Sequence, residues 1–280
     1  MAGIIRASDI SGSLDAKNIA MGVLTKALDI SNLVQIAQVV EVPELVATIP
    51  VMNPAAGNED LEEWESTLVE SGDFTNVDFS LKKDRVKIGV SDESRYKSRA
   101  GDPLSLQEAS AAARLAYLLD KKIVTALQTN PQTSSTGAIW STVTNNPMKD
   151  LATAAAAIGP YTADYCIMPR NVFSAFVANN YTSQFIQGNP EKLNGVLTTI
   201  PGLNLKVFVN DNVTAKSVIV GASGAPSVAV GNGPVKVRRE DSMNGGEIYQ
   251  MDVFRQAVAP ILKNSSNKNM AAYQVTGVIA

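Results

Sequence analysis

The sequence predicts an α+β fold, and three observations support that class. Segments rich in β-branched residues or with alternating apolar and polar residues, typical of strands, lie at residues 33–53, at 74–90 and after Gly202. Helical patterns start near Ser105 and near Asn146, and no repeat of fixed period joins the segments. A content of 45% hydrophobic and 18% charged residues in 280 excludes a disordered chain and a highly charged nucleic-acid-binding tail.

The first thirty residues contain one helical pattern. Its apolar side chains recur at mixed three- and four-residue spacings: Leu14, Ile19, Met21, Val23, Leu24 and Leu28. Ser13 is the candidate N-cap. Because the pattern is short and follows a polar lead, we expect it to be an arm more than a core element.

Residues 33–53 and 74–90 predict strands on either side of a charged segment. Pro43 and Pro50 restrict the first group to edge or irregular strands. In the second group, three apolar residues alternate on one face: Val86, Ile88 and Val90. The two groups together predict a long two-stranded β-arm. Such an arm is marginal alone in water and needs a surface to lie on.

The strongest helix signal follows Asp102-Pro103. Ser105 and Glu108 fit a capping box, and Asn130-Pro131 ends the pattern. About 24 residues at ~1.5 Å per residue predict a helix of roughly 36 Å.

A second helix is predicted after Asn146, with Pro147 in its first turn and Gly159 at its end. The segment Y-C-I-M-P predicts a short buried strand, and a third helix follows it, with three apolar residues on one face: Phe173, Phe176 and Val177. Strands follow Gly202 to the C-terminus. G-A-S-G-A-P and G-N-G-P join strands and lack the Gly-Lys-Ser/Thr of a phosphate loop, so they predict tight turns.

Charge is distributed unevenly along the chain. No lysine or arginine lies between Asn32 and Leu81, whereas that span holds ten acids: Glu41, Glu44, Glu59, Asp60, Glu62, Glu63, Glu65, Glu70, Asp73 and Asp78. Seven bases follow directly: Lys82, Lys83, Arg85, Lys87, Arg95, Lys97 and Arg99. One interpretation is a solvated acidic loop beside a basic strand. The other is a pair of complementary surfaces that meet within one chain or between copies.

The second interpretation identifies candidate intersubunit contact residues. They are Glu59, Asp60, Glu62, Glu63 and Glu65 on the acidic side, and the seven bases from Lys82 to Arg99 on the basic side.

Residue content argues against most catalytic chemistry. The chain has no histidine, which excludes Ser-His-Asp and Cys-His mechanisms and most zinc sites. The single cysteine, Cys166, lies in an apolar strand and is predicted to be a buried, inert thiol. Glu59 to Glu65 lacks the glycine and ligand spacing of a calcium loop. We therefore predict no catalytic residue, cofactor or metal site.

The sequence gives little support to membrane insertion or nucleic-acid recognition. No basic start followed by an apolar run marks a signal peptide, and no window approaches the ~20 apolar residues of a membrane span. Among residues 82–99, only Tyr96 is aromatic, so base stacking is weakly supported. We expect a soluble protein in the cytosol.

The order of these parts resembles that of tailed-phage (or archaeal tailed-virus) major capsid proteins with the Hong Kong 97-type fold. The resemblance is most specific from Asn76 to Gln128, where a strand leaves an extended loop and leads into a spine helix. Y-C-I-M-P-R-N-V-F-S-A-F resembles the strand-then-helix step of the family. V-K-V-R-R-E-D and E-I-Y-Q-M-D-V-F-R-Q-A-V-A resemble its closing strands.

The resemblance implies an N-arm at residues 1–32 and an extended loop at 33–82. It implies a peripheral domain at 83–158 and 252–280, and an axial domain at 159–251. It further implies a non-enzymatic subunit that forms hexamers and pentamers of an icosahedral shell around the viral genome, assembled in the host cytoplasm without a membrane. No scaffolding segment precedes the arm, so we expect a scaffold to be a separate protein or absent. The resemblance also implies portal and decoration proteins as further partners.

Some members of that family join subunits covalently through a loop lysine and an asparagine of a neighbour. The span from Asn32 to Leu81 has no lysine, so we expect noncovalent contacts. Two alternatives remain. An encapsulin-type compartment shell resembles the capsid in fold and holds an enzyme in place of a genome. A histidine-independent soluble enzyme is the least supported alternative.

Overall fold

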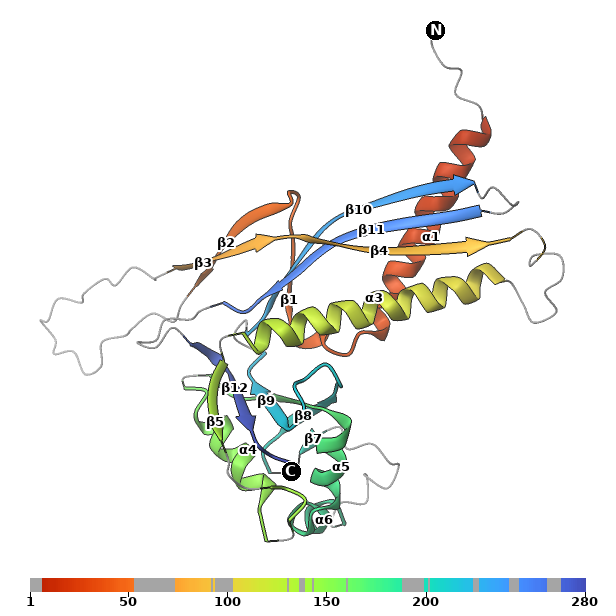
Figure 1. The fold of residues 1–280 in the computed structure, drawn as a ribbon. Coiled ribbons are helices and arrows are strands. Elements are labelled where there is room, and N and C mark those ends of the chain that lie inside the picture. Colours follow the sequence, from red (N-terminus) through yellow and green to blue (C-terminus); the bar gives the residue numbers. More distant parts are fainter. Residues whose placement is uncertain are drawn as a thin grey trace, which may run out of the picture. The chain divides into compact units, whose positions relative to one another are not determined.

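The computed structural model describes residues 7–52, 74–91, 93, 103–129, 131–135, 139–142, 144–159, 161–187, 199–200, 202–223, 227–241, 247–260 and 268–280. Helices and strands are both present, as predicted (Figure 1). The chain forms two compact units. The first unit comprises residues 1–46, 80–123 and 230–257, and the second comprises 47–79, 124–229 and 258–280. Among the described helices, none combines the length and apolar character needed to cross a membrane.

The first unit is built on a four-stranded sheet. Its strand order is β1-β10-β11-β4, where β1 is Gln38–Glu41, β4 is Lys82–Val90, β10 is Ala229–Asp241 and β11 is Glu247–Val258. Long strands β4, β10 and β11 lie side by side (Figure 1). A short 3₁₀ helix, Val34–Ile36, precedes β1, where the sequence had predicted strand.

Helices α1 (Ala7–Ile30) and α3 (Pro103–Leu127) supply the other half of the first unit's core. One cluster joins them to the sheet: Ala20, Val23, Ala27, Ile88, Ala111, Ala112, Leu115, Tyr249, Met251 and Val253. The alanines on both helices allow close approach, and the sheet contributes the larger side chains.

Helix α1 is longer and more central than expected. It begins at Ala7, so Ser13 lies inside the helix and the predicted N-cap is wrong. Val23 and Ala27 are fully buried against the sheet, whereas Met21 is 69% exposed. One side of the helix therefore belongs to the core, and the segment is more than an arm.

Helix α3 confirms the long helix expected after Asp102, with one correction. It begins at Pro103, which suits a first-turn position because proline has no N–H to leave unpaired. Ser105 thus lies within the first turn and does not cap it. Glu108 instead accepts a hydrogen bond from Lys26 of α1 at 3.3 Å.

The predicted turn at Gly231–Pro234 is wrong, because these residues lie inside the continuous strand β10. The glycine at 233 serves close packing. A Cβ there would overlap the Leu81 side chain and lie 3.1 Å from the Phe254 carbonyl oxygen. The close approach of neighbouring segments of the same chain, and not a change of chain direction, explains why residue 233 is a glycine.

Strands β2 (Val46–Met52) and β3 (Phe74–Ser80) pair as a separate two-stranded sheet. This confirms that strands on both sides of the charged segment meet, but the predicted long arm is too long, because β1 and β4 belong to the four-stranded sheet. The Thr48 hydroxyl donates a hydrogen bond of 2.6 Å to Asp78. Val77 and Phe79 are buried, while Pro50 is tolerated in this narrow sheet because every strand is an edge.

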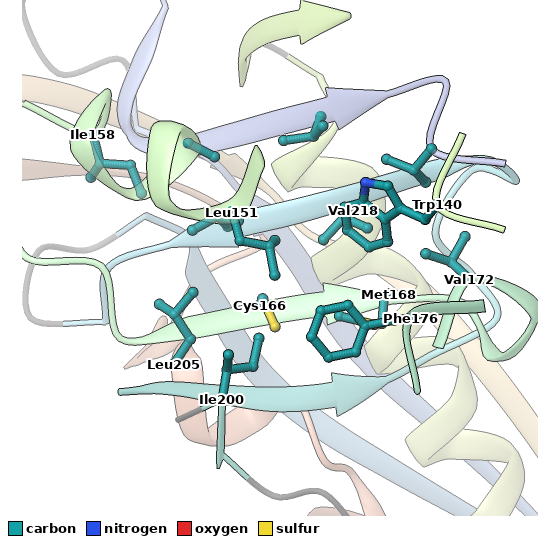
Figure 2. Packing of buried hydrophobic residues seen from close by; sticks show 14 of the residues in the cluster. Trp140, Leu151, Ile158, Cys166, Met168, Val172, Phe176, Ile200, Leu205 and Val218 are labelled. Atoms are coloured by element: carbon teal, nitrogen blue, oxygen red, sulfur yellow. The ribbon is translucent and has the colours of Figure 1, made fainter. Parts of the chain in front are cut away.

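The second unit contains a six-stranded sheet of order β5-β12-β9-β6-β8-β7. The strands are β5 (Pro131–Ser135), β6 (Tyr165–Met168), β7 (Thr199–Ile200), β8 (Leu205–Val209), β9 (Ser217–Gly221) and β12 (Asn269–Thr276). Helices α4 (Pro147–Ala156), α5 (Arg170–Ala178) and α6 (Asn180–Gln187) accompany it. Figure 2 shows the core, in which Trp140, Leu151, Cys166 and Phe176 gather around β6.

Local signals in the second unit were predicted well. The Asn146 side chain accepts hydrogen bonds from the backbone N–H groups of Met148 and Lys149, and Pro147 follows in the first turn. Gly159 has φ +78°, a conformation that glycine adopts without strain. Cys166 is fully buried, and burial raises the pKa of its thiol, as expected for an inert cysteine.

Strand pairing explains how the chain is distributed between the two compact units. Strand β12 pairs with β5 and β9, which groups residues 131–158 and 268–280 with 159–229 in the second unit. Strand β11 pairs with β4, so residues 230–251 belong with the first unit. Such long-range pairing is invisible to local patterns.

Substitution of Gly233 distinguishes a packed strand from a turn. We expect Gly233→Ala to lower the free energy of unfolding by about 1–3 kcal/mol, because the added methyl overpacks a closed contact. Gly22→Ala is the control. Its Cβ would meet nothing within 4 Å in α1, so a gain of about 0.5–1 kcal/mol is expected. Denaturant unfolding measures both, and a neutral Gly233→Ala would contradict the packing argument.

Candidate interaction surface

The predicted contact residues fall into two groups. Glu59, Asp60, Glu62, Glu63 and Glu65, together with Arg95, Lys97 and Arg99, lie outside the described residues. The structure places the other four bases, Lys82, Lys83, Arg85 and Lys87, on β4.

Antiparallel pairing sorts these four bases onto two sides of the sheet. Val86 and Ile88 lie opposite Met251 and Tyr249 and face the helices. Lys83, Arg85 and Lys87 have the alternate parity, opposite Phe254, Asp252 and Gln250, and therefore share the other face. Lys82 lies opposite Arg255 and is separated from the other three.

Strand β10 adds two cations that the charge pattern alone did not identify. Val237 packs against the core of the first unit, so its neighbours Lys236 and Arg238 point to the opposite side. The Lys236 ammonium lies 5.8 Å from the centre of the Phe254 ring. We call Lys83, Arg85, Lys87, Lys236 and Arg238 the basic face; all five are exposed.

One buried carboxylate organises this face. Asp252, on the central strand β11, accepts two hydrogen bonds from Arg85, at 2.7 Å from Nε and 3.0 Å from Nη2. The hydrogen bond from Arg85 holds the pKa of Asp252 below its usual range against the opposing effect of burial. The charges of Arg85, Lys83 and Arg238 lower the pKa further. Asp252 is therefore ionised at neutral pH and fixes the Arg85 guanidinium in place.

The other side of the same strands carries a buried polar cluster. Lys122 of α3 donates to Asp84 of β4 at 2.5 Å and to the backbone carbonyl of Arg255 at 2.8 Å. Arg255 is only 3% exposed and donates to Asn232 at 3.0 Å. Burial lowers the pKa of Arg255, which nevertheless stays charged because guanidinium titrates far above neutrality. This cluster connects α3 to β4, β10 and β11, and the basic face lies on the opposite side of these strands.

The basic face is suited to binding an anion-rich surface. Its side chains are donors and cations, and the carboxylate among them is already engaged by Arg85. The alternation V-K-V-R-R in the sequence could have placed Lys236 and Arg238 on one face of a strand. Nothing local to either strand could show that this strand lies one strand away from β4, because the pairing joins residues far apart in the chain.

Asp252→Asn tests the organising role of the carboxylate. At pH 7 we expect a loss of roughly 1–3 kcal/mol in unfolding free energy, because the charged hydrogen-bond acceptor of Arg85 is removed. A lowered pKa in the folded state gives stability that is present above the unfolded value of about 3.9 and lost as pH falls through the folded value. The difference between wild type and variant should therefore shrink below about pH 4.

Asp211→Asn is the matched control, because Asp211 is 63% exposed and its ion pair with Arg170 spans 3.9 Å. The variant keeps an oxygen to accept the Arg170 backbone N–H, so a change under about 1 kcal/mol is expected. Equal losses in both variants at every pH would show that Asp252 has no special role.

Comparisons with solved structures support the capsid architecture. A capsid chain of a native GTA particle aligns with a TM-score of 0.62 at 12% identity, covering 100% of this chain and 93% of that one. A virus-like particle from Pyrococcus furiosus gives 0.61 at 9% identity, covering 92% and 98%. A chain from Mycobacterium phage Bobi gives 0.60 at 11% identity, covering 88% and 90%. At such identities the likeness concerns the fold, which is the Hong Kong 97-type fold.

Sequence comparison supplies the family. No curated protein matches the chain. A family model described as phage capsid protein matches residues 75–266, which is more than half of the sequence and includes β4, α3, β10 and β11. The chain therefore belongs to the phage capsid protein family.

Proposed function

We propose that this capsid protein is the major subunit of an icosahedral shell, arranged as pentamers and hexamers, that encloses a viral genome. The observation that carries the proposal is the family match across residues 75–266. The capsid folds of the structural neighbours support it, since they come from assembled particles by their descriptions. We expect a structural protein without turnover, assembled in the host cytoplasm.

We further propose how the two units serve the shell. The first unit, with α3 along its long sheet, would be the peripheral domain, and the second unit would be the axial domain that meets its copies around symmetry axes. The β2–β3 pair would be the base of the extended loop. This layout moves the boundaries of both domains to the limits of the compact units.

Contacts between subunits would include the acidic segment Glu59–Glu65 of one copy on the basic strand Lys82–Arg99 of the next. Residues 32–81 carry ten acids and no base, so these segments repel one another and require a cationic partner. The described part of that strand supports the proposal, since Lys83, Arg85 and Lys87 lie together on one exposed side.

Self-assembly is the first test. Purified protein, alone and with a co-expressed scaffold, should form closed shells visible by electron microscopy. Particles from infected cells should contain DNA, whereas an enzyme inside them would favour a compartment shell. A protein that stays monomeric at high concentration under both conditions would contradict the proposal.

Shells should dissociate into single chains of 29.7 kDa on hot denaturing gels under reducing conditions. Residues 32–81 contain no lysine, and one buried cysteine cannot build a covalent network. A ladder of crosslinked species would show that covalent joining occurs elsewhere in the chain.

Charge reversal in the acidic segment should block assembly. Replacing Glu62, Glu63 and Glu65 by lysine would place cations opposite the cations of the basic strand. Each ion pair lost is worth only about 0.2–1 kcal/mol, and salt weakens such pairs further. The control reverses three exposed acids elsewhere, Asp29, Glu41 and Glu44. Light scattering at equal protein concentration measures assembly, and equal behaviour of the two triple variants would remove the special role of the segment.

A further inference from the structure

Two strands, β4 and β10, present cations on the side of the first unit's sheet that faces away from α1 and α3. We infer that the whole basic face is the docking surface for the acidic segment of a second copy, with Lys236 and Arg238 of β10 as contact residues beside Lys83 and Lys87 of β4. The inference rests on the proposed shell function and assigns the receiving residues.

Charge is the first argument. Among the described side chains of β4, β10 and β11 on this face, five are cations and one is a carboxylate. Asp252 is 5% exposed and bound by Arg85, so it neutralises that arginine and presents little charge to a partner. Lys83, Lys236 and Arg238 are exposed cations on this face besides Arg85, and a docked anion would meet them.

Geometry is the second argument. Strand β11 separates β4 from β10, so the cations form two rows about 10 Å apart, and within a row they recur at about 7 Å. Five carboxylates within the seven residues Glu59–Glu65 match this density of charge. The pattern suits a narrow, multiply charged chain lying over β11 better than one isolated anion.

The lack of an aromatic platform favours the acidic segment over nucleic acid. Phe254 is half-buried beneath Lys236, and no other aromatic side chain is described on this side of β4 and β11. Single-stranded nucleic acids bind through bases stacked on exposed aromatics as well as through phosphate contacts.

Each copy carries both the acidic segment and the basic face, and this determines the symmetry of the contact between copies. A segment of one copy on the face of the next is a head-to-tail contact, and such contacts close into rings when the rotation permits. The same charges prevent two basic faces, or two acidic segments, from meeting.

Two triple variants test whether the contact is made between copies. The segment variant replaces Glu62, Glu63 and Glu65 by lysine. The face variant replaces Lys83, Lys236 and Arg238 by glutamate and leaves Arg85 in place, because Asp252 would otherwise lose its partner. Each alone should fail to assemble. Mixed in equal amounts they should form assemblies that contain both, because in a ring with an even number of copies, such as a hexamer, each segment can meet a complementary face.

Pairing within one chain predicts the opposite result. Mixing the two variants would then not restore assembly, because each chain would still carry a mismatched segment and face. A single chain that carries all six substitutions would assemble. That outcome, with thermal unfolding of both variants within a few degrees of wild type, would overturn the inference. A control variant replaces three exposed lysines of the second unit, Lys149, Lys206 and Lys216, by glutamate, and mixing it with the segment variant should not restore assembly of the segment variant.

A binding measurement keeps the inference separate from shell formation. A fluorescein-labelled peptide of residues 55–72 is titrated with full-length wild-type protein at low salt, below the concentration at which particles form. We expect saturable binding that Lys236→Glu with Arg238→Glu weakens roughly tenfold, and that a scrambled peptide without clustered acids does not reproduce.

Binding with no assembly would support the docking surface while contradicting the shell. Unchanged binding by the double variant, or tighter binding of an oligonucleotide than of the peptide, would overturn it.

Discussion

The antiparallel register between β4 and β11 decides on which side of the sheet each side chain of the first unit lies. Nine consecutive pairs, from Glu247 with Val90 to Arg255 with Lys82, hold it in place. A slip of one residue would turn Lys83, Arg85 and Lys87 toward the helices and expose the apolar residues between them. The ion pair of Arg85 with Asp252 belongs to this register, since the two residues face each other directly across the strands.

The polar interactions differ between the two sides of that sheet. On the helix side, direct hydrogen bonds join Lys122, Asp84 and Arg255, although Nη1 of the buried Arg255 has no hydrogen-bond partner among the described residues. This cluster specifies where the end of α3 meets the strands. On the other side the five cations are exposed, and Arg85 among them is bound to the buried Asp252. The apolar contribution comes from the alanine-rich surfaces of α1 and α3 against Tyr249 and Met251.

Local structure was largely predictable from the sequence because its signals are local. Asn146 with Pro147 marks a helix start by its chemistry alone, and an unbroken apolar run around Cys166 marks a buried strand. The failures share a different cause. Gly231–Pro234 has the composition of a turn, but packing against Leu81 and Phe254 keeps it extended. Lys236 and Arg238 joined the candidate surface only once long-range pairing had placed β10 beside β11.

The basic face has a consequence for how such a protein changes over generations. Every copy in a shell comes from one gene, so a reversed charge at Arg238 appears at once in all copies, with no unaltered neighbour to compensate. If the face receives the acidic segment as we propose, a tolerated change on the face would require a matching change in that segment. Lineages that have drifted along different matched pairs would build separate shells inside the same host cell, because each segment would reject the other's face.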